Sequence, residues 1–438
     1  RGLFDHVGGG FCRYSVDRYW QIPHFEKMLY DNGPLLAFYA QAGLATGEQW
    51  FSYAANATAD WMLADMQADN GGFYATRDAD SEGHEGIYYL WRPEQVQELL
   101  GDDYEVFARR FGLDQDANFE GQWHLTVRES IGDVAAASGH NEKDVVSIID
   151  RAAKTLLTER LKRVPPGRDE KQLTSWNALA IRGLAIAGRA LDRPDLVEAA
   201  VRATQFLQST LFVDGRLVAS YKDDEARFAA YLDDHAFLLD ALLELLQARW
   251  DTAHLEFAVQ IADLMLAHFE DREDGAFFFT ADDHETLIHR PKPLADDAVP
   301  SGNGIAAYAL QRLGFLLGET RYLDAAERTL RASWQAISEY PHGHVSLLSA
   351  LEEYLVHPEI IVIRGDSDEI ARWQHTAARL YAPRRLVFGI SSEARDVPGA
   401  LADRAALAGE TVAYRGLGTH CEMPVTTWEA LAAQLSGE

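Results

Sequence analysis

Four segments of the chain, each about 33 residues long, share one pattern of apolar and polar positions. Each begins with a polar cluster, continues with an apolar stretch of helical period, breaks briefly and ends in a second amphipathic stretch. This pattern predicts an αα-hairpin whose first helix is apolar almost all round and buried, and whose second helix has one apolar stripe. The four segments are 31–63, 175–207, 233–266 and 301–334. An inner ring and an outer ring of helices are therefore expected.

A second recurrence links these hairpins. After each outer helix come a glycine, a β-prone run and then acids, at 71–82, 214–225 and 274–285, and the opening stretch 8–17 fits the same place. These runs predict short β-hairpins that cross one rim of a helical ring. The expected fold class is all-α, an (α/α)6 toroid whose axial cavity is lined by inner-helix N-termini and these loops.

The count of six hairpins needs two less regular regions. Residues 93–163 offer one further hairpin, and a lone helix is expected near 345–356. That helix would meet a partner upstream of Arg1, so we expect a chain truncated at its start. Three strand-like runs and two helical stretches in the tail predict a small α/β extension. The predicted domains are 1–356, the toroid, and 357–438, the extension.

Composition and charge exclude several classes of partner and site. The chain has 438 residues and a formal net charge of −28, which argues against nucleic acid or an anionic membrane as partner. Its two cysteines, Cys12 and Cys421, have no zinc-site spacing, and neither a membrane-spanning apolar run nor a signal-peptide pattern is present. A cytoplasmic protein without cofactor or metal is expected.

The opening stretch concentrates candidate chemistry. His24, Glu26, Lys27 and Asp31 fall within eight residues, and apolar periodicity does not account for them. They predict a polar cavity wall with His24 or Glu26 as acid or base. The alternative is a buried ion-pair network in which Lys27 pairs with an acid.

The densest acidic loop follows the first hairpin. It contains Asp78, Asp80, Glu82 and Glu85, with Tyr88 just beyond. Glycoside chemistry uses two carboxylates on opposite sides of a sugar and aromatic rings that stack on its faces, so Asp80 and Glu82 are candidate catalytic acids. The alternative is a solvated or cation-binding acidic turn.

Polar residues also recur where the inner helices begin. By the repeat, Asn32, Asn177, Asp234 and Asn303 are expected to point toward one axial cavity, although each is also an ordinary capping residue. Further candidate ligand-binding residues, for which structural roles in caps or Arg–aromatic stacks are the alternative, are Asp233, Trp176, Arg13, Tyr14 and Trp20.

Five motifs carry a family resemblance: GGFCRYSVDRYWQIPHFEKMLYDN, DADSEGHEGIYYLW, LTSWNALAI, YLDDHAFLLDALLEL and AVPSGNGIAAYAL. In this order they resemble the family of the spermatogenesis-associated thioredoxin-like protein and its bacterial relatives. The resemblance implies a thioredoxin-fold domain followed by a toroid similar to six-hairpin glycosidases and N-acylglucosamine 2-epimerase. This chain has only the toroid part, so no redox motif is carried over. Cys12 stands where the family usually has His, and His235 where it usually has Tyr.

Two functions are compatible with these observations. The first is a carbohydrate-active enzyme, glycosidase-like or epimerase-like, that acts on a small saccharide. Asp80, Glu82 or Asp234 would supply acid/base chemistry, with His24 as proton carrier in an epimerase. The second is a non-catalytic toroid that binds a ligand or partner and serves a thioredoxin-like domain.

Overall fold

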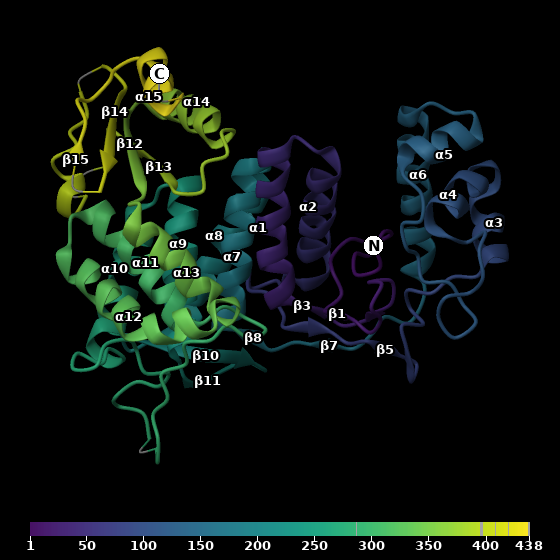
Figure 1. The fold of residues 1–438 in the computed structure, drawn as a ribbon, viewed down its shortest axis with the longest axis horizontal. Helices are drawn as coiled ribbons and strands as arrows, with labels where there is room; N and C mark the ends of the chain where they lie inside the picture. Colours follow the sequence, from purple (N-terminus) through teal and green to yellow (C-terminus); the bar gives the residue numbers. More distant parts are fainter. Residues whose placement is uncertain (286, 395–396, 408, 419, 437–438) are drawn as a thin grey trace. The chain divides into compact units, whose positions relative to one another are not determined.

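The computed structural model describes residues 1–285, 287–394, 397–407, 409–418 and 420–436 (Figure 1). The chain falls into two compact units. Unit 1 comprises Arg1–Leu36, Tyr53–Gln67 and Tyr74–Lys171, and unit 2 comprises Ala37–Ser52, Ala68–Phe73 and Gln172–Glu438. The boundary runs through the first predicted hairpin, which consists of α1 (Leu29–Thr46) and α2 (Gln49–Trp61).

Unit 1 contains three small antiparallel sheets, which carry most of the opening polar stretch. β1 pairs with β2, β4 pairs with β3 and β7, and β5 pairs with β6. The strands are β1 (Tyr14–Ser15), β2 (Pro23–His24), β3 (Lys27–Met28), β4 (Thr76–Arg77), β5 (Asp80–Ser81), β6 (His84–Glu85) and β7 (Arg168–Asp169). The short π-helix η1 (Met62–Met66) continues α2 toward β4.

The region 93–163 differs from the single hairpin offered by the sequence. It forms four α-helices, because apolar residues from all four share one core that includes Val96, Phe107, Val134 and Leu156. The helices are α3 (Pro93–Leu100), α4 (Tyr104–Phe111), α5 (Ile131–Ser138) and α6 (Glu142–Arg160), with the 3₁₀ turn η2 (Gly101–Asp103) between the first two.

Unit 2 contains the other three predicted hairpins, which are confirmed. They are α7 (Thr174–Ala190) with α8 (Pro194–Thr210), α9 (Leu232–Ala248) with α10 (Thr252–His268), and α11 (Gly302–Leu317) with α12 (Thr320–Glu339). The lone helix is α13 (Val345–Leu355), preceded by the 3₁₀ turn η3 (Pro341–Gly343).

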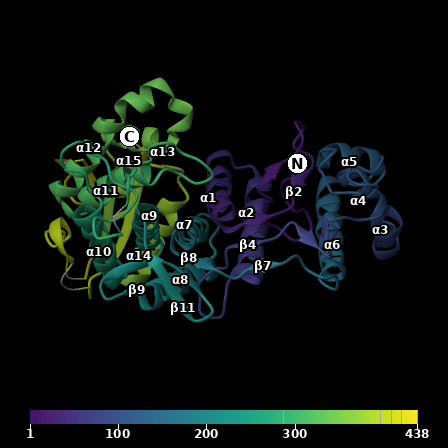
Figure 2. The same ribbon diagram turned by 90° about the horizontal axis from the view of Figure 1, so that it is seen from below.

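The first helices of these hairpins form an inner row. α7 packs against α9, α9 against α11, and α11 against α13, while α8, α10 and α12 each pack on their own hairpin partner (Figures 1 and 2). Helix α9 is buried at nearly every position, as its continuous apolar sequence predicts, whereas α12 buries a single stripe. The distinction between inner and outer helices is thus confirmed in unit 2.

One of the β-prone runs, 214–225, forms strands in unit 2. β8 (Gln172–Leu173) and β9 (Phe212–Val213) pair with β10 (Arg216–Lys222), which also pairs with β11 (Glu225–Ala229). The run 274–285 forms only an isolated bridge between Glu270 and Phe277 among the described residues. These segments lie toward the N-terminal ends of the inner helices, at the lower side of Figure 1.

The tail forms the predicted α/β fold. β12 (Glu359–Gly365) pairs in parallel with β13 (Arg385–Ser391) across α14 (Ser367–Ala378), and antiparallel with β14 (Val412–Leu417). β15 (His420–Cys421), the turn η4 (Gly399–Leu401) and α15 (Trp428–Ser436) complete it. The side chain of Gln247, near the end of α9, accepts a hydrogen bond from the backbone N–H of Val387 at 3.2 Å, so this part covers the C-terminal ends of inner helices.

The predicted fold class, an all-α fold of helical hairpins of the toroid kind with short β-strands at one end and a small α/β part, is confirmed. The domain boundary at residue 356, the count of six hairpins and the closure of the ring stay predictions. Within the described part of the chain, no helix combines the length and the apolar character that a membrane span requires.

Candidate active site

His24 lies between two carboxylates in unit 1. Its Nδ1 atom is 2.8 Å from Oε1 of Glu85, and its Nε2 atom is 3.3 Å from Oε2 of Glu26. The β1–β2 pair sets Tyr14 opposite His24, and the two rings stack with centroids 5.1 Å apart. The imidazole is therefore fixed at both nitrogens and on one face, while about a quarter of the side chain (26%) stays accessible to solvent.

Arg13 and Asp31 extend this group of charges. Arg13 NH1 is 3.2 Å from Oε2 of Glu26, and its backbone N–H donates to the Glu26 carbonyl at 2.9 Å. Asp31 lies in the first turn of α1, and its buried Oδ2 has no hydrogen-bond partner. Burial raises the pKa of Asp31 to about 7, the Arg13 guanidinium partly offsets the rise, and the Glu26 carboxylate adds to it. A carboxyl of this kind can hold or release a proton near neutral pH.

Lys27, predicted to bind a ligand, is instead part of a buried ion network. Its Nζ donates at 2.7 Å both to Oδ2 of Asp5 and to the carbonyl of Gly9, and the side chain is 1% exposed. Arg160 binds the same Asp5 carboxylate through both terminal nitrogens, at 2.9 and 2.8 Å. Burial alone would raise the pKa of Asp5, but the Arg160 guanidinium and the Lys27 ammonium hold it well below its usual range. The ion-pair alternative is thus the correct one for Lys27.

The acidic loop contributes one carboxylate to the His24 group. Glu85 on β6 is that residue, while its register partner Asp80 on β5 is exposed, as is Glu82 in the turn between the two strands. Asp78 is exposed too, and its Oδ1 accepts the backbone N–H of Ala79 at 2.7 Å. The structure therefore brings the loop to His24 through Glu85, not through the two acids predicted to be catalytic.

Two aromatic candidates in unit 1 have different surroundings. Tyr88 is half-buried, with the Arg160 guanidinium 5.3 Å from its ring centroid and the core residues Tyr89 and Phe25 beside it. Trp20 is exposed at the tip of the β1–β2 hairpin. Tyr88 thus belongs to the structural core of this unit, and Trp20 remains available to a ligand.

The side chains of the recurring asparagines bind backbone groups and do not face a cavity. Asn177 accepts the N–H of Phe73 at 2.6 Å and donates to the Phe73 carbonyl at 3.0 Å, and no part of its side chain is exposed. Asn303 makes the same pair of bonds with Phe277, and Asn32 makes it with Phe11. Since both polar atoms of each amide are used in this way, the expected ligand-binding role of Asn177 and Asn303 is corrected.

Each pair of hydrogen bonds between an asparagine amide and a phenylalanine backbone is called an asparagine clamp below. A pattern in the sequence marks these clamps. Each of these phenylalanines lies one or two residues after a glycine of the β-prone run, as in GGGF11, GGF73 and DGAF277. In the remaining repeat, His235 is the fourth residue of α9, as Asn32 and Asn177 are the fourth residues of α1 and α7, and its Nδ1 lies 2.8 Å from the carbonyl of Tyr231 four residues before it. Asp234 therefore lies one position before the residue that is equivalent to Asn32 and Asn177 in the other repeats.

Asp234 connects two inner helices of unit 2. Its Oδ1 accepts the backbone N–H of Ser175 at 2.9 Å, at the start of α7, and its Oδ2 accepts the N–H of Tyr231 at 2.8 Å, before α9. Asp296, which the sequence reasoning missed, accepts the N–H groups of Ser301 and Ser346 in the same way, at 2.8 and 2.9 Å. The structure thus shows Asp234 joining two helix starts, and its catalytic role stays a prediction.

Asp233 and Trp176 lie at the same end of unit 2. Burial raises the pKa of Asp233 to about 7, and the neighbouring Asp234 carboxylate adds to the rise. The Oδ1 atom of Asp233 is buried without a hydrogen-bond partner, and a Cβ atom on Gly302 would lie 2.1 Å from it. The half-buried Trp176 adjoins Ser175 on α7. Both side chains stay candidates for ligand binding.

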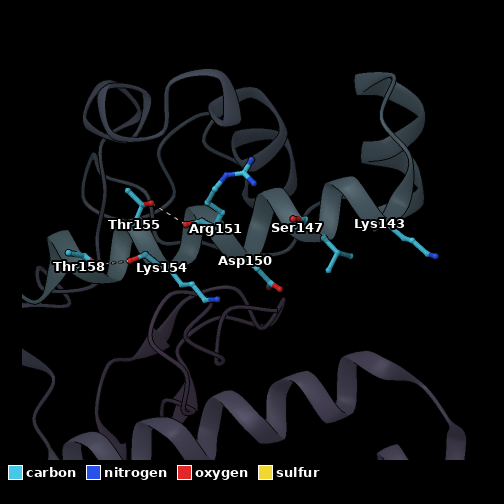
Figure 3. A pocket seen from close by; sticks show the side chains of 8 residues that line it. Lys143, Ser147, Asp150, Arg151, Lys154, Thr155 and Thr158 are labelled. Atoms are coloured by element: carbon cyan, nitrogen blue, oxygen red, sulfur yellow. Dashed lines mark hydrogen bonds between the residues drawn. The ribbon is translucent and has the colours of Figure 1, made fainter.

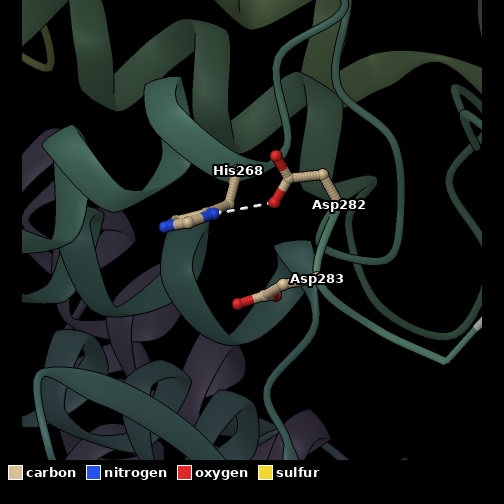
Figure 4. A group of neighbouring side chains, drawn as sticks. All are labelled: His268, Asp282 and Asp283. Carbon is tan, nitrogen blue, oxygen red and sulfur yellow. Dashed lines mark hydrogen bonds and ion pairs between the residues drawn. The ribbon is translucent and has the colours of Figure 1, made fainter.

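One group in unit 2 has the composition of a metal site. The ligand atoms of His268, Asp282 and Asp283 lie within 4.8 Å of one another, and His268 Nδ1 is 2.7 Å from Oδ1 of Asp282 (Figure 4). However, Arg216 binds both oxygens of Asp283. Because a guanidinium already neutralises that carboxylate, the residues do not favour a cation.

Two hollows among the described residues lie away from the predicted site residues. An open hollow of about 620 Å³ follows one face of α6, with Lys143, Asp150 and Lys154 among its lining (Figure 3). A cavity of about 430 Å³ lies where the α/β part meets the ends of α7 and α9, with Arg189 and Gln247 in its wall. None of the predicted site residues lines either one.

Comparison with known proteins identifies the relatives of this chain. It is 31% identical to human spermatogenesis-associated protein 20 over 402 residues, which are 83% of this chain and 51% of that protein. An uncharacterised protein of Caenorhabditis elegans is 30% identical over 400 residues, covering 83% of this chain and 54% of its own length. The chain is a homologue of spermatogenesis-associated protein 20 over this range. It spans about half the length of the curated relatives it matches.

No protein-family model matches the sequence. Among solved structures, a sugar epimerase from a ruminal bacterium aligns with 77% of this chain and 82% of its own, at 13% identity and a TM-score of 0.37. A mannosidase of glycoside hydrolase family 76 from Bacteroides thetaiotaomicron covers 76% and 67%, at 11% identity and a TM-score of 0.42. At this level of similarity nothing about the site of this chain follows from either structure.

Proposed function

We propose that this chain is a carbohydrate-active enzyme that epimerises or isomerises a small reducing saccharide, with His24 as the proton carrier. The observation that supports this most is the imidazole held between Glu26 and Glu85. A histidine is the side chain best suited to taking up and returning a proton near neutral pH. The two carboxylates would fix its ring orientation and tautomer.

The same geometry disfavours a two-carboxylate glycosidase. That mechanism needs the scissile bond of the sugar between the two carboxyl groups. Here the His24 ring occupies the space between Glu26 and Glu85, and it hydrogen-bonds Glu85 directly. The carboxylates therefore act on the histidine, and the histidine acts on the substrate.

The proposed reaction moves two protons between the sugar and the side chains of His24 and Asp31. In the open-chain form of a reducing sugar, His24 removes the proton from the carbon next to the carbonyl, and the freed electron pair forms a carbon–carbon double bond. The carbonyl oxygen takes a proton from Asp31, whose raised pKa keeps it protonated below pH about 7. Protonation of the same carbon from its other face, with the enol proton returned to Asp31, gives the epimer. Protonation of the former carbonyl carbon, with Asp31 accepting the proton of the neighbouring hydroxyl group as its carbonyl forms, gives the ketose isomer.

A panel of reducing mono- and disaccharides tests the proposal. Each sugar is incubated with the protein and the products are identified by NMR, for the wild type and for His24→Asn. We expect a slow appearance of an epimer or a ketose with the wild type and a loss of at least about 100-fold with the variant. His140→Asn, an exposed histidine before α6, is the matched control and is expected to behave as wild type. Conversion that survives in His24→Asn would contradict the proposal.

The competing hypothesis is a toroid without catalytic activity that serves a thioredoxin-like domain. It predicts no conversion of any sugar and tight binding of a separately expressed thioredoxin-like domain. The proposal keeps the cytoplasmic location expected from the sequence, where the free thiols of Cys12 and Cys421 would stay reduced.

A further inference from the structure

The hairpin that carries His24 also displays a group of exposed apolar side chains. Tyr19 is 52% exposed and Trp20 is 59% exposed, and both lie in the tip that joins β1 to β2. Tyr14 and Val16, on the first strand and just after it, are exposed to a similar degree. Large apolar side chains gathered on one small surface segment mark an interaction site more often than scattered ones do.

The tip is held rigidly in place. The Asp17 carboxylate accepts backbone N–H groups from Tyr19, Gln21 and Ile22, at 2.6, 3.0 and 2.6 Å. These bonds lower the pKa of Asp17 against the effect of its partial burial. The Arg18 guanidinium lies 4.7 Å from the centroid of the Tyr19 ring. The aromatic residues are thus presented in one preorganised arrangement, which reduces the entropic cost of binding.

Trp20 has an unusual backbone conformation. Its φ angle is 61°, in the left-handed region that bulky residues seldom adopt. The carbonyl of Trp20 accepts the N–H of Gly2 at 2.9 Å, which holds this conformation from outside the loop. A strained conformation maintained in this way at an exposed tryptophan suggests a role in recognition.

The aromatic tip is continuous with the candidate active site. Tyr14 stacks on His24, and Trp20 is four residues from His24 along the chain, so their Cα atoms are at most about 14 Å apart. We infer that Tyr19 and Trp20 form a stacking platform for further rings of the substrate, which would then be a neutral oligosaccharide rather than a single sugar. This inference rests on the proposed function, and it names the substrate class of the same site.

The charges around the hairpin favour a neutral chain. Asp78, Asp80 and Glu82 are exposed in and just before the neighbouring β5–β6 hairpin, and the whole chain carries a net charge of −28. Of the two cations on the β1–β2 hairpin, Arg13 is paired with Glu26, and Arg18 donates to the hydroxyl of Tyr19. Sugars with carboxylate or sulfate groups would be repelled there. The apolar C–H faces of neutral pyranose rings can instead pack on the exposed aromatic rings.

The experiment measures affinity against chain length. Gluco-, manno- and galacto-oligosaccharides of one to six rings are titrated against wild type, Trp20→Ala and Trp20→Tyr by calorimetry. We expect the affinity of the wild type to rise with ring number and this gain to fall about five- to tenfold in Trp20→Ala, with partial recovery in Trp20→Tyr. Trp334→Ala is the matched control, because Trp334 on α12 is equally exposed, at 59%.

The outcomes separate the two proposals. A gain with chain length that Trp20→Ala removes supports the platform, even if no sugar is converted and the proposed chemistry fails. Affinity independent of ring number, an equal loss in Trp334→Ala, or an effect of Trp20→Ala only on binding of a thioredoxin-like domain would overturn it.

Discussion

Nδ1 of His24 lies 2.8 Å from Oε1 of Glu85, although 61 residues separate them in the sequence. The contact joins the β1–β2 hairpin to the β5–β6 hairpin, which Glu85 ends. It also leaves Nε2 of His24 on the side of Glu26. Because a hydrogen bond at one ring nitrogen fixes the state of the other, Glu85 is the residue that sets the tautomer of His24.

Glu85→Gln is expected to lower kcat/KM by about 10- to 100-fold, the effect usual for a residue that orients a functional histidine. The reason is that a neutral amide no longer stabilises positive charge on the imidazole. The measurement is the rate of sugar conversion, with Glu98→Gln on the exposed face of α3 as control. Equal rates for Glu85→Gln and wild type would show that the contact is only structural.

Asp31 predicts a pH dependence of the rate. Since burial raises the pKa of Asp31 to about 7, the proton-donating form is lost above that pH. We expect kcat/KM of the wild type to decrease by about tenfold per pH unit above pH 7, and Asp31→Asn to be slow without this decrease. A wild-type rate that is flat from pH 6 to pH 9 would exclude Asp31 as the acid.

Asp31 also predicts a pH dependence of stability. The folded-state pKa is above the value in the unfolded chain, so its contribution is fully present below pH about 4 and is lost as the pH rises to about 7. The melting temperature of Asp31→Asn relative to wild type should therefore increase between pH 4 and pH 7 and stay level above that. A constant difference across this range would contradict the assigned shift.

The asparagine clamps predict large losses of stability. Asn177→Ala removes three hydrogen bonds, one of them to the Leu173 carbonyl, and leaves the buried N–H and C=O of Phe73 without this partner, at a cost of about 2–4 kcal/mol in the free energy of unfolding. Asn141→Ala, at the N-cap of α6, should cost only about 1 kcal/mol. Urea unfolding measures both, and similar losses in the two variants would refute the clamp.

Lys27→Met tests the buried network. It removes the hydrogen-bond donor to the buried Gly9 carbonyl and one of the two cations at Asp5, while Arg160 still pairs with that carboxylate, so we expect a loss of about 1–3 kcal/mol. Glu327→Ala, which removes an exposed ion pair with Arg331 on α12, should cost about 0.5 kcal/mol or less. A stable Lys27→Met variant with weakened sugar affinity would restore the ligand-binding role predicted from the sequence.

The hairpins of unit 2 could be predicted because their signal is local. Thirty-residue repeats of apolar and polar positions specify helix pairs such as α9 and α10 without reference to the rest of the chain. Residues 93–163 lacked such a repeat, and four helices around a shared core, three of them only 8 residues long, cannot be distinguished from one irregular hairpin by periodicity alone.

The site was predictable only in part, because contacts between segments distant in the sequence determine which side chains meet. His24, Glu26 and Asp31 were found from their proximity in the sequence. Which loop acid meets His24 depends on the β5–β6 register, which sets Glu85 opposite Asp80. The role of Lys27 depends on Asp5 and Arg160, and Arg160 is 155 residues from Asp5.

The most direct test of the central claim is the exchange of sugar C–H protons with solvent. The protein is incubated in D₂O with each reducing sugar that binds, and deuterium at the carbon next to the carbonyl is followed by NMR. The account predicts incorporation with the wild type, a rate at least about 100-fold lower with His24→Asn, and a wild-type rate with His140→Asn. Incorporation that is equally fast with His24→Asn, or absent with every sugar that binds, would contradict it.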